Sequence, residues 1–213
     1  MPPKLALLLS VVLIFYLFYA NKGKIIGVSK GIIIPFLWIL PSASREYSFW
    51  LYYFFNISSS SNSVVEGNPH ERLIEIILIS FAVVILSKRK INLGYYLKKN
   101  VWVFLYFFVG AISILWSDYP LVSFKRLIKA VGTVLMAMII LSEENPIGAL
   151  GEVIKWLGFI LLPLSVVLIK YFPDLGKSYH MGMPMYSGVA DQKNGLGQIC
   201  LICGIYFLWF LIF

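Results

Sequence analysis

The chain has 213 residues, of which 60% are hydrophobic and 13% charged, and its net charge is +8. Soluble domains carry roughly 25% charged residues, so an ordinary soluble domain is excluded. The apolar residues come in blocks that approach the ~20 residues needed to cross a bilayer core, and in lipid such blocks must be helical because every backbone amide needs an internal partner. We therefore predict an all-α fold, a polytopic transmembrane helical bundle in which residues 1–213 form a single transmembrane domain.

The apolar blocks predict about seven crossings. In chain order they are Leu5–Ala20, Gly31–Leu40, Leu73–Ser87, Val101–Trp116, Leu127–Leu141, Ala149–Tyr171 and Gln198–Phe213. The aromatic stretch Tyr47–Phe55 is expected to lie along the membrane interface. We expect no sheet. The glycine-rich stretch Pro173–Gly197 is too long for a minimal connection between helices and is typical of a functional loop.

Basic residues gather in two of the predicted connections. They are Lys22, Lys24 and Lys30 in one, and Lys88, Arg89, Lys90, Lys98 and Lys99 in the other. Cytoplasmic loops of membrane proteins are enriched in lysine and arginine, so both connections are predicted to be cytoplasmic and Phe172–Gly197 to face outward. These residues would also contact membrane lipid. They are not interleaved with stacking aromatic residues, so no nucleic-acid partner is predicted.

A polar cluster, Asp191–Gly197, stands where the chain is expected to re-enter the membrane. A helix start gathers backbone N–H groups, and with Lys193 beside them they would suit an anionic group such as a lipid diphosphate. Glycines in the cluster would let a ligand or a neighbouring helix approach the backbone closely. The alternative interpretation is a plain turn with an Asn or Gln helix cap.

The segment that contains this cluster, Gly188–Gly197 (GVADQKNGLG), resembles the G-x-x-x-H-K-N-x-L-G signature of the O-antigen ligase/polymerase superfamily. The other segments that resemble that family, in the family's order, are Pro41–Arg45 with Trp50, Glu66–Pro69 with Glu71 and Arg72, Ser113–Pro120 (SILWSDYP), and Ser123–Arg126. The chain is therefore similar to the amino-terminal half of such a protein, in the bacterial inner (plasma) membrane.

The resemblance implies a function in cell-surface polysaccharide assembly. Proteins of this type transfer a glycan from an undecaprenyl diphosphate carrier to an acceptor sugar without a metal or another cofactor, and arginines neutralise the diphosphate leaving group. The substrate-binding residues that it implies here are Arg126, Gly188, Gln192, Lys193, Asn194, Gly195 and Gly197. No catalytic residue is assigned.

The chain departs from the family pattern in two ways. Gln192 stands where the signature has a histidine, and an amide can form hydrogen bonds but cannot shuttle a proton. No arginine follows Arg126, so the family's late external loop with its catalytic residues is missing, and the chain is expected to be the first half of a longer protein or a truncated one. The alternatives are a truncated non-catalytic family member and a transporter or flippase of lipid-linked sugars. Pro35 and Pro163 favour the transporter because they would interrupt helices.

The remaining polar residues have simpler interpretations. Arg126 could bind a diphosphate or extend to the interface, and Lys155 is expected to extend to the cytoplasmic interface. His70 and His180 have no partners at metal-ligand spacing, so no metal site is predicted.

Overall fold

The computed structural model describes residues 2–21, 27–55, 68–89, 93–180 and 182–212, and 82% of them are helical. The chain divides into two compact units. Unit 1 comprises Met1–Glu46 and Glu143–Phe213, and unit 2 comprises Tyr47–Ser142. That the two form one transmembrane domain stays a prediction. Several residues named above lie outside the described residues: Lys22, Lys24, Glu66, Gly67 and Lys90.

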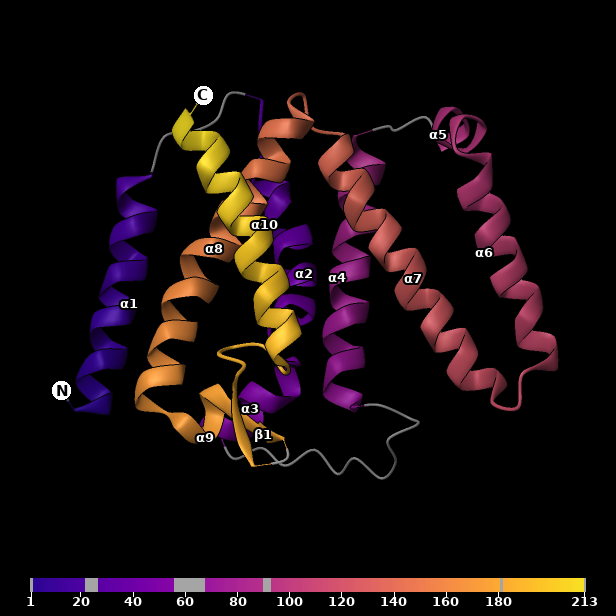
Figure 1. Ribbon diagram of the computed structural model, residues 1–213. Coiled ribbons are helices and arrows are strands. Elements are labelled where there is room, and N and C mark those ends of the chain that lie inside the picture. The colour runs from indigo at the N-terminus through magenta and orange to yellow at the C-terminus, as the bar shows by residue number, and fades with distance from the viewer. Residues whose placement is uncertain (1, 22–26, 56–67, 90–92, 181, 213) are drawn as a thin grey trace. The chain divides into compact units, whose positions relative to one another are not determined.

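Unit 1 is built around one long helix, α8 (Pro146–Tyr171). It contacts three other helices of the unit (Figure 1). They are α1 (Pro3–Ala20), α2 (Ile33–Ala43, preceded by the 3₁₀ turn η1, Lys30–Ile32) and α10 (Lys193–Ile212). The start of α8 is fixed by Asn145, whose side chain accepts a hydrogen bond from the Gly148 N–H at 2.9 Å, and by Pro146 in the first turn. Its end precedes Pro173, which opens the short helix α9 (Pro173–Gly176).

The connection before η1 docks on the start of α8. The Ser29 N–H and hydroxyl donate to the two carboxylate oxygens of Glu143 at 2.8 and 2.7 Å, and the Asn145 N–H donates to the Gly27 carbonyl at 3.2 Å. Gly27 has a φ of +81°, a conformation that glycine adopts readily. These contacts place two connections that are distant in sequence at the same end of unit 1.

In its described residues, unit 2 consists of helices. They are α3 (Tyr47–Phe55), α4 (Pro69–Lys88), α5 (Leu93–Lys99), α6 (Val101–Ser113), the 3₁₀ turn η2 (Ile114–Trp116) and α7 (Pro120–Leu141). Helix α4 packs on α7, and α6 and α7 diverge from the short connection between them (Figure 1). Arg89 ties the end of α4 to the end of α7, because its Nη1 donates to the Ile139 carbonyl at 2.8 Å and to the Ser142 hydroxyl at 2.5 Å.

Three of the predicted crossings are long and apolar enough to span a membrane: α1, α8 and α10. Two others are apolar but short, α2 with η1 and α6 with η2. The last two are long but more polar, since α4 holds Glu71, Arg72 and Glu75 and α7 holds three basic residues. Seven crossings therefore stay a prediction.

Helix α7 begins at Pro120 rather than at Leu127, so the basic residues Lys125 and Arg126 lie within the helix and not in a loop before it. The signal for this start is Pro120 itself. Proline lacks an N–H that the first turn of a helix would leave unsatisfied, and its fixed φ suits that turn.

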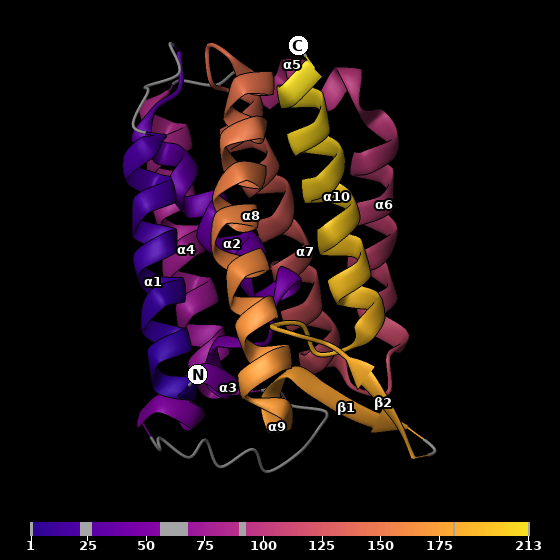
Figure 2. The same ribbon diagram turned by 60° about the vertical axis from the view of Figure 1, so that its left-hand side comes forward.

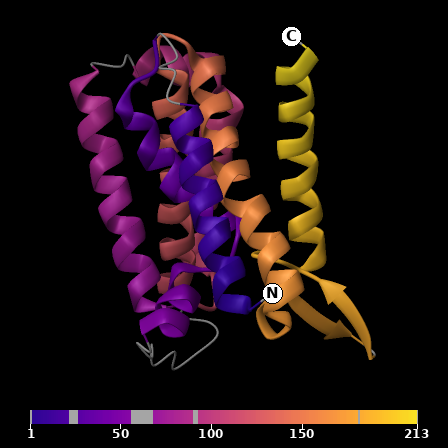
Figure 3. The same cartoon turned by 90° about the vertical axis from the view of Figure 1, so that its left-hand side faces the viewer.

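The expectation that the chain contains no sheet was wrong. Strand β1 (Lys177–His180) pairs antiparallel with β2 (Met183–Tyr186), with Lys177 opposite Tyr186. Gly182 in the turn has a φ of +76°, as tight hairpin turns require. The hairpin projects from the end of unit 1 where α8 ends and α10 begins (Figures 2 and 3). The predicted loop Pro173–Gly197 thus holds α9, this hairpin, the irregular stretch 187–192 and the start of α10.

Candidate functional site

The first residues of the signature segment are fixed inside unit 1. The Gly176 carbonyl accepts hydrogen bonds from the N–H groups of Ser187 and Gly188, both at 3.0 Å, and the Ala190 N–H donates to the Ser187 carbonyl at 3.0 Å. Ser187, Val189 and Ala190 are all buried. Residues 187–190 therefore form a rigid base for the residues that follow.

Two glycines allow this base to approach α8. A Cβ on Gly176 would lie 2.3 Å from the Leu168 carbonyl carbon, and a Cβ on Gly188 would lie 2.7 Å from the Ser165 Cβ. Gly188 also has a φ of +58°, and the next N–H, that of Val189, donates to the Ser165 hydroxyl at 3.3 Å. Gly188, which the resemblance implies to be a substrate-binding residue, is thus held by packing against α8.

The next four residues, 191–194, are exposed. Helix α10 begins at Lys193, and the Gln192 carbonyl accepts from the Leu196 N–H at 3.2 Å, which makes Gln192 its first backbone acceptor. Lys193 and Asn194 therefore lie in the first turn, where backbone N–H groups have no partner within the helix. Gly195 lies against Ala190, whereas a Cβ on Gly197 would meet open space.

Arg45 joins this loop from a distant part of the sequence. Its Nη2 donates to the Leu175 carbonyl at 2.6 Å. Burial lowers the pKa of the Arg45 guanidinium, and the charge of Asp191 opposes that shift. An arginine remains protonated in proteins, so a partly buried cation lies beside the signature loop. Sequence reasoning placed Arg45 in a family segment but missed this contact, because nothing local in the sequence indicates which carbonyl a guanidinium reaches.

Arg126, by contrast, belongs to unit 2, where it is exposed on α7. One turn further on, Lys129 forms an ion pair with Glu75 of α4, with an N–O distance of 2.6 Å. The closeness of Arg126 to Lys193 stays a prediction.

The segment with Asn68 and Glu71 holds α3 against α4 within unit 2. Glu71 accepts from the Ser48 N–H at 2.7 Å, and the Asn68 side chain donates to the Ser48 hydroxyl at 2.9 Å. Burial, together with the nearby Glu71 carboxylate, raises the pKa of Tyr47 to about 12. These contacts give the segment a structural role.

An apolar groove of about 440 Å³ lies between α1 and α8 in unit 1. Its walls come from the first half of α1, including Leu9 and Leu13, and from the last part of α8, including Pro163 and Val166. Tyr171 lines it as well, and the chain enters the candidate loop directly after that residue. The groove therefore approaches the end of unit 1 that carries the loop.

A buried ion pair lies within α8. Glu152 and Lys155 are 7% and 5% exposed, and the Lys155 ammonium contacts the Glu152 carboxylate one turn earlier. The expectation that Lys155 extends to the membrane interface was wrong, because α8 is surrounded by α1, α2 and α10 and its lysine finds a carboxylate within the protein. Ionisable residues inside an apolar helix are costly and mark candidate functional positions.

Comparison of the chain with protein-family models, with curated proteins and with solved structures gives no match. Within the described part of the chain, no group of three or more His, Cys, Asp or Glu side chains could hold a metal ion.

Proposed function

We propose that the chain is a membrane protein of cell-surface polysaccharide assembly, of the O-antigen ligase/polymerase type, in the bacterial inner membrane. In this proposal it binds the undecaprenyl diphosphate end of a lipid-linked glycan at the end of unit 1 that carries the signature loop. The observation that supports it most is the contact of Arg45 with Leu175, together with its electrostatic interaction with Asp191. Arg45 and Asp191 belong to two segments that resemble the family separately, and both segments lie in unit 1.

The chemistry of this end suits a lipid diphosphate. Lys193 is exposed in the first turn of α10, where the helix dipole favours an anion, and Arg45 adds a second cation to the loop. The groove between α1 and α8 offers an apolar surface for the polyprenyl chain. Fixed cations at a diphosphate stabilise the charge that develops when the glycan–diphosphate bond breaks. Because Gln192 cannot carry a proton, this chain's residues are assigned donor binding and not proton transfer.

The test is binding of undecaprenyl diphosphate to the purified chain in lipid nanodiscs. Lys193→Ala is expected to weaken binding about ten- to hundredfold, because a hydrogen bond to a charged group contributes roughly 1.5–3 kcal/mol. The matched control is Lys177→Ala, which removes a cation of the same loop that lies 5.5 Å from the centre of the Tyr186 ring. The control should have a much smaller effect. Equal losses of affinity in the two variants would show that the effect comes from general surface charge, and would contradict the proposal.

A second candidate, a transporter of lipid-linked sugars, is favoured by the buried Glu152–Lys155 pair and by Pro163 inside the same helix. Pro35 does not support the transporter, because Pro35 lies in the first turn of α2, where proline does not interrupt a helix. A transporter should move a labelled lipid-linked sugar across proteoliposomes, and Glu152→Gln should abolish this movement without weakening diphosphate binding. Absence of movement by the unsubstituted chain would exclude this candidate.

A further inference from the structure

A second apolar groove lies in unit 2, between the α5–α6 segment and α7. Its volume is about 460 Å³, within the range of ordinary ligand pockets. Phe104 and Phe107 of α6 face Ala137 and Met138 of α7 across it. The groove forms where the two helices diverge, away from their short connection (Figure 1). It is therefore a concave apolar site and not merely the smooth face of a helix.

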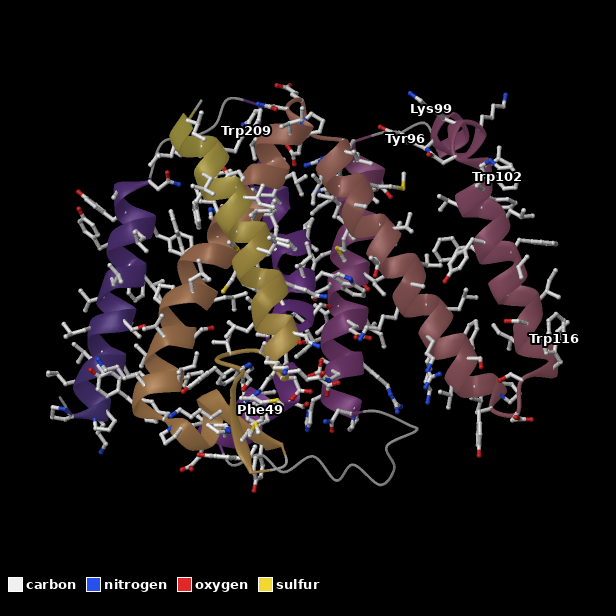
Figure 4. All side chains as sticks on the ribbon, in the orientation of Figure 1. Phe49, Tyr96, Lys99, Trp102, Trp116 and Trp209 are labelled. Atoms are coloured by element: carbon white, nitrogen blue, oxygen red, sulfur yellow. The ribbon has the colours of Figure 1, made fainter. Side chains whose placement is uncertain are left out.

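One end of this groove is polar and leads to cations. Asn100 lines that end, and the Asn100 side chain donates to the Tyr96 carbonyl at 3.1 Å. Lys98 and Lys99, in the last turn of α5, directly precede Asn100 and are exposed. Figure 4 shows Tyr96 and Lys99 together at this end of unit 2. An apolar groove whose polar end is lined by Asn100, next to two lysines in the chain, is complementary to a molecule with a hydrocarbon chain and an anionic head.

Two tryptophans mark the depth of α6 and η2 in a bilayer. Trp102 is 82% exposed and Trp116 is 69% exposed, and they lie at opposite ends of this segment (Figure 4). Tryptophan is enriched at the membrane–water interfaces, so the end with Trp102 and the two lysines belongs at headgroup level and the groove below it among the lipid chains.

We propose that the groove holds an acyl chain of an anionic phospholipid whose headgroup phosphate faces Lys98 and Lys99. The charge distribution of the chain predicts that this end is cytoplasmic, the side on which anionic phospholipid attracts basic segments. Lys98 and Lys99 immediately precede Asn100, which lines the polar end of the groove, so they are the cations next to that end in the chain. The proposal concerns unit 2 and does not depend on the function proposed for unit 1.

The test measures retention of phosphatidylglycerol by the purified full chain in detergent, by native mass spectrometry during a titration. Each lysine near a membrane surface strengthens the attraction to anionic lipid about fivefold, so Lys98→Gln with Lys99→Gln should weaken binding about 25-fold. Lys4→Gln with Lys125→Gln removes the same charge from exposed positions in α1 and near the start of α7, away from Asn100 in the chain, and should leave binding unchanged. Phosphatidylcholine binding should be the same in all of these proteins.

A second variant tests the groove itself. Ala137→Phe fills it and should lower phosphatidylglycerol retention at least as much as the double lysine variant, whereas Val109→Phe, at an exposed α6 residue that does not line the groove, should not. The lysine variants alter only exposed side chains and should fold. They therefore still test phospholipid binding if Ala137→Phe fails to fold. Equal retention by the double lysine variant and its control would overturn the proposal. The proposal would also be overturned if the protein bound undecaprenyl diphosphate in preference to phosphatidylglycerol and lost this preference in the double lysine variant.

Discussion

The two units differ in how deeply their helices and their ion pairs are buried. In unit 1, α8 lies among three helices, and its ion pair, Glu152–Lys155, is almost fully buried. In unit 2, α6 has no buried residue, and the pair Glu75–Lys129 has side chains 24% and 59% exposed. Removing one partner of an ion pair enclosed by protein leaves an isolated buried charge, whereas a partly exposed pair is not enclosed by protein and loses less when one partner is removed.

The largest expected effect comes from breaking the buried pair. Glu152→Leu should lower the free energy of unfolding by about 3–5 kcal/mol, because Lys155 would be left buried without its carboxylate partner. Lys129→Met in unit 2 should lower it by only about 0–1 kcal/mol. Thermal unfolding of the purified variants in detergent measures both.

The double substitution Glu152→Leu with Lys155→Met supplies the control. Replacing a whole buried pair by apolar side chains of similar size is often neutral, so most of the lost stability should return. If the double variant is as unstable as Glu152→Leu alone, the pair is not the source of the effect and the contrast between the two units fails.

The next largest effect concerns the base of the candidate loop. Gly176→Ala and Gly188→Ala should each lower the free energy of unfolding by about 1–3 kcal/mol, because the added methyl group would overlap α8. Gly204→Ala in α10 meets nothing within 4 Å and should stabilise the protein by about 0.5–1 kcal/mol. The same melting measurements apply, and a stabilising Gly188→Ala would show that the loop does not pack on Ser165.

The smallest expected effect is the pH dependence from Tyr47 in unit 2. Its pKa is raised to about 12, above the ordinary value of 10.0. The phenol therefore stays protonated in the folded state while the unfolded chain ionises, and its contribution to stability is lost as the pH rises from about 10 to 12. Tyr47→Phe should make unfolding less sensitive to pH in this window, as followed by thermal unfolding at a series of pH values. An unchanged pH dependence would show that Tyr47 is as accessible to water when folded as when unfolded.

Much of the helix pattern could be predicted from the sequence, because long apolar runs identify helices such as α1, α8 and α10 without knowledge of their neighbours. The hairpin could not be predicted in the same way. Each of its strands has four residues, too few for a clear periodicity, and its strongest local signal is Gly182 in the turn.

The candidate site was predictable only in part. The exposed start of α10 at Lys193 follows from the polar cluster before an apolar run. The contact of Arg45 with Leu175 and the enclosure of Lys155 both depend on which helices are neighbours in space, and a single sequence does not contain that information. The resemblance implies that Gly188 binds substrate. Its close packing on Ser165 is a second, structural reason for a glycine at this position.

The most direct test of the central claim, that Arg45 and Lys193 face one lipid diphosphate, is a double-mutant cycle on undecaprenyl diphosphate binding in nanodiscs. Arg45→Gln, Lys193→Ala and the double variant are compared with the unsubstituted chain. Residues that share one ligand group should be coupled by about 0.5–3 kcal/mol, so the double variant should lose clearly less or more affinity than the sum of the single losses. Losses that add to within about 0.3–0.5 kcal/mol, or no loss in either single variant, would contradict the account.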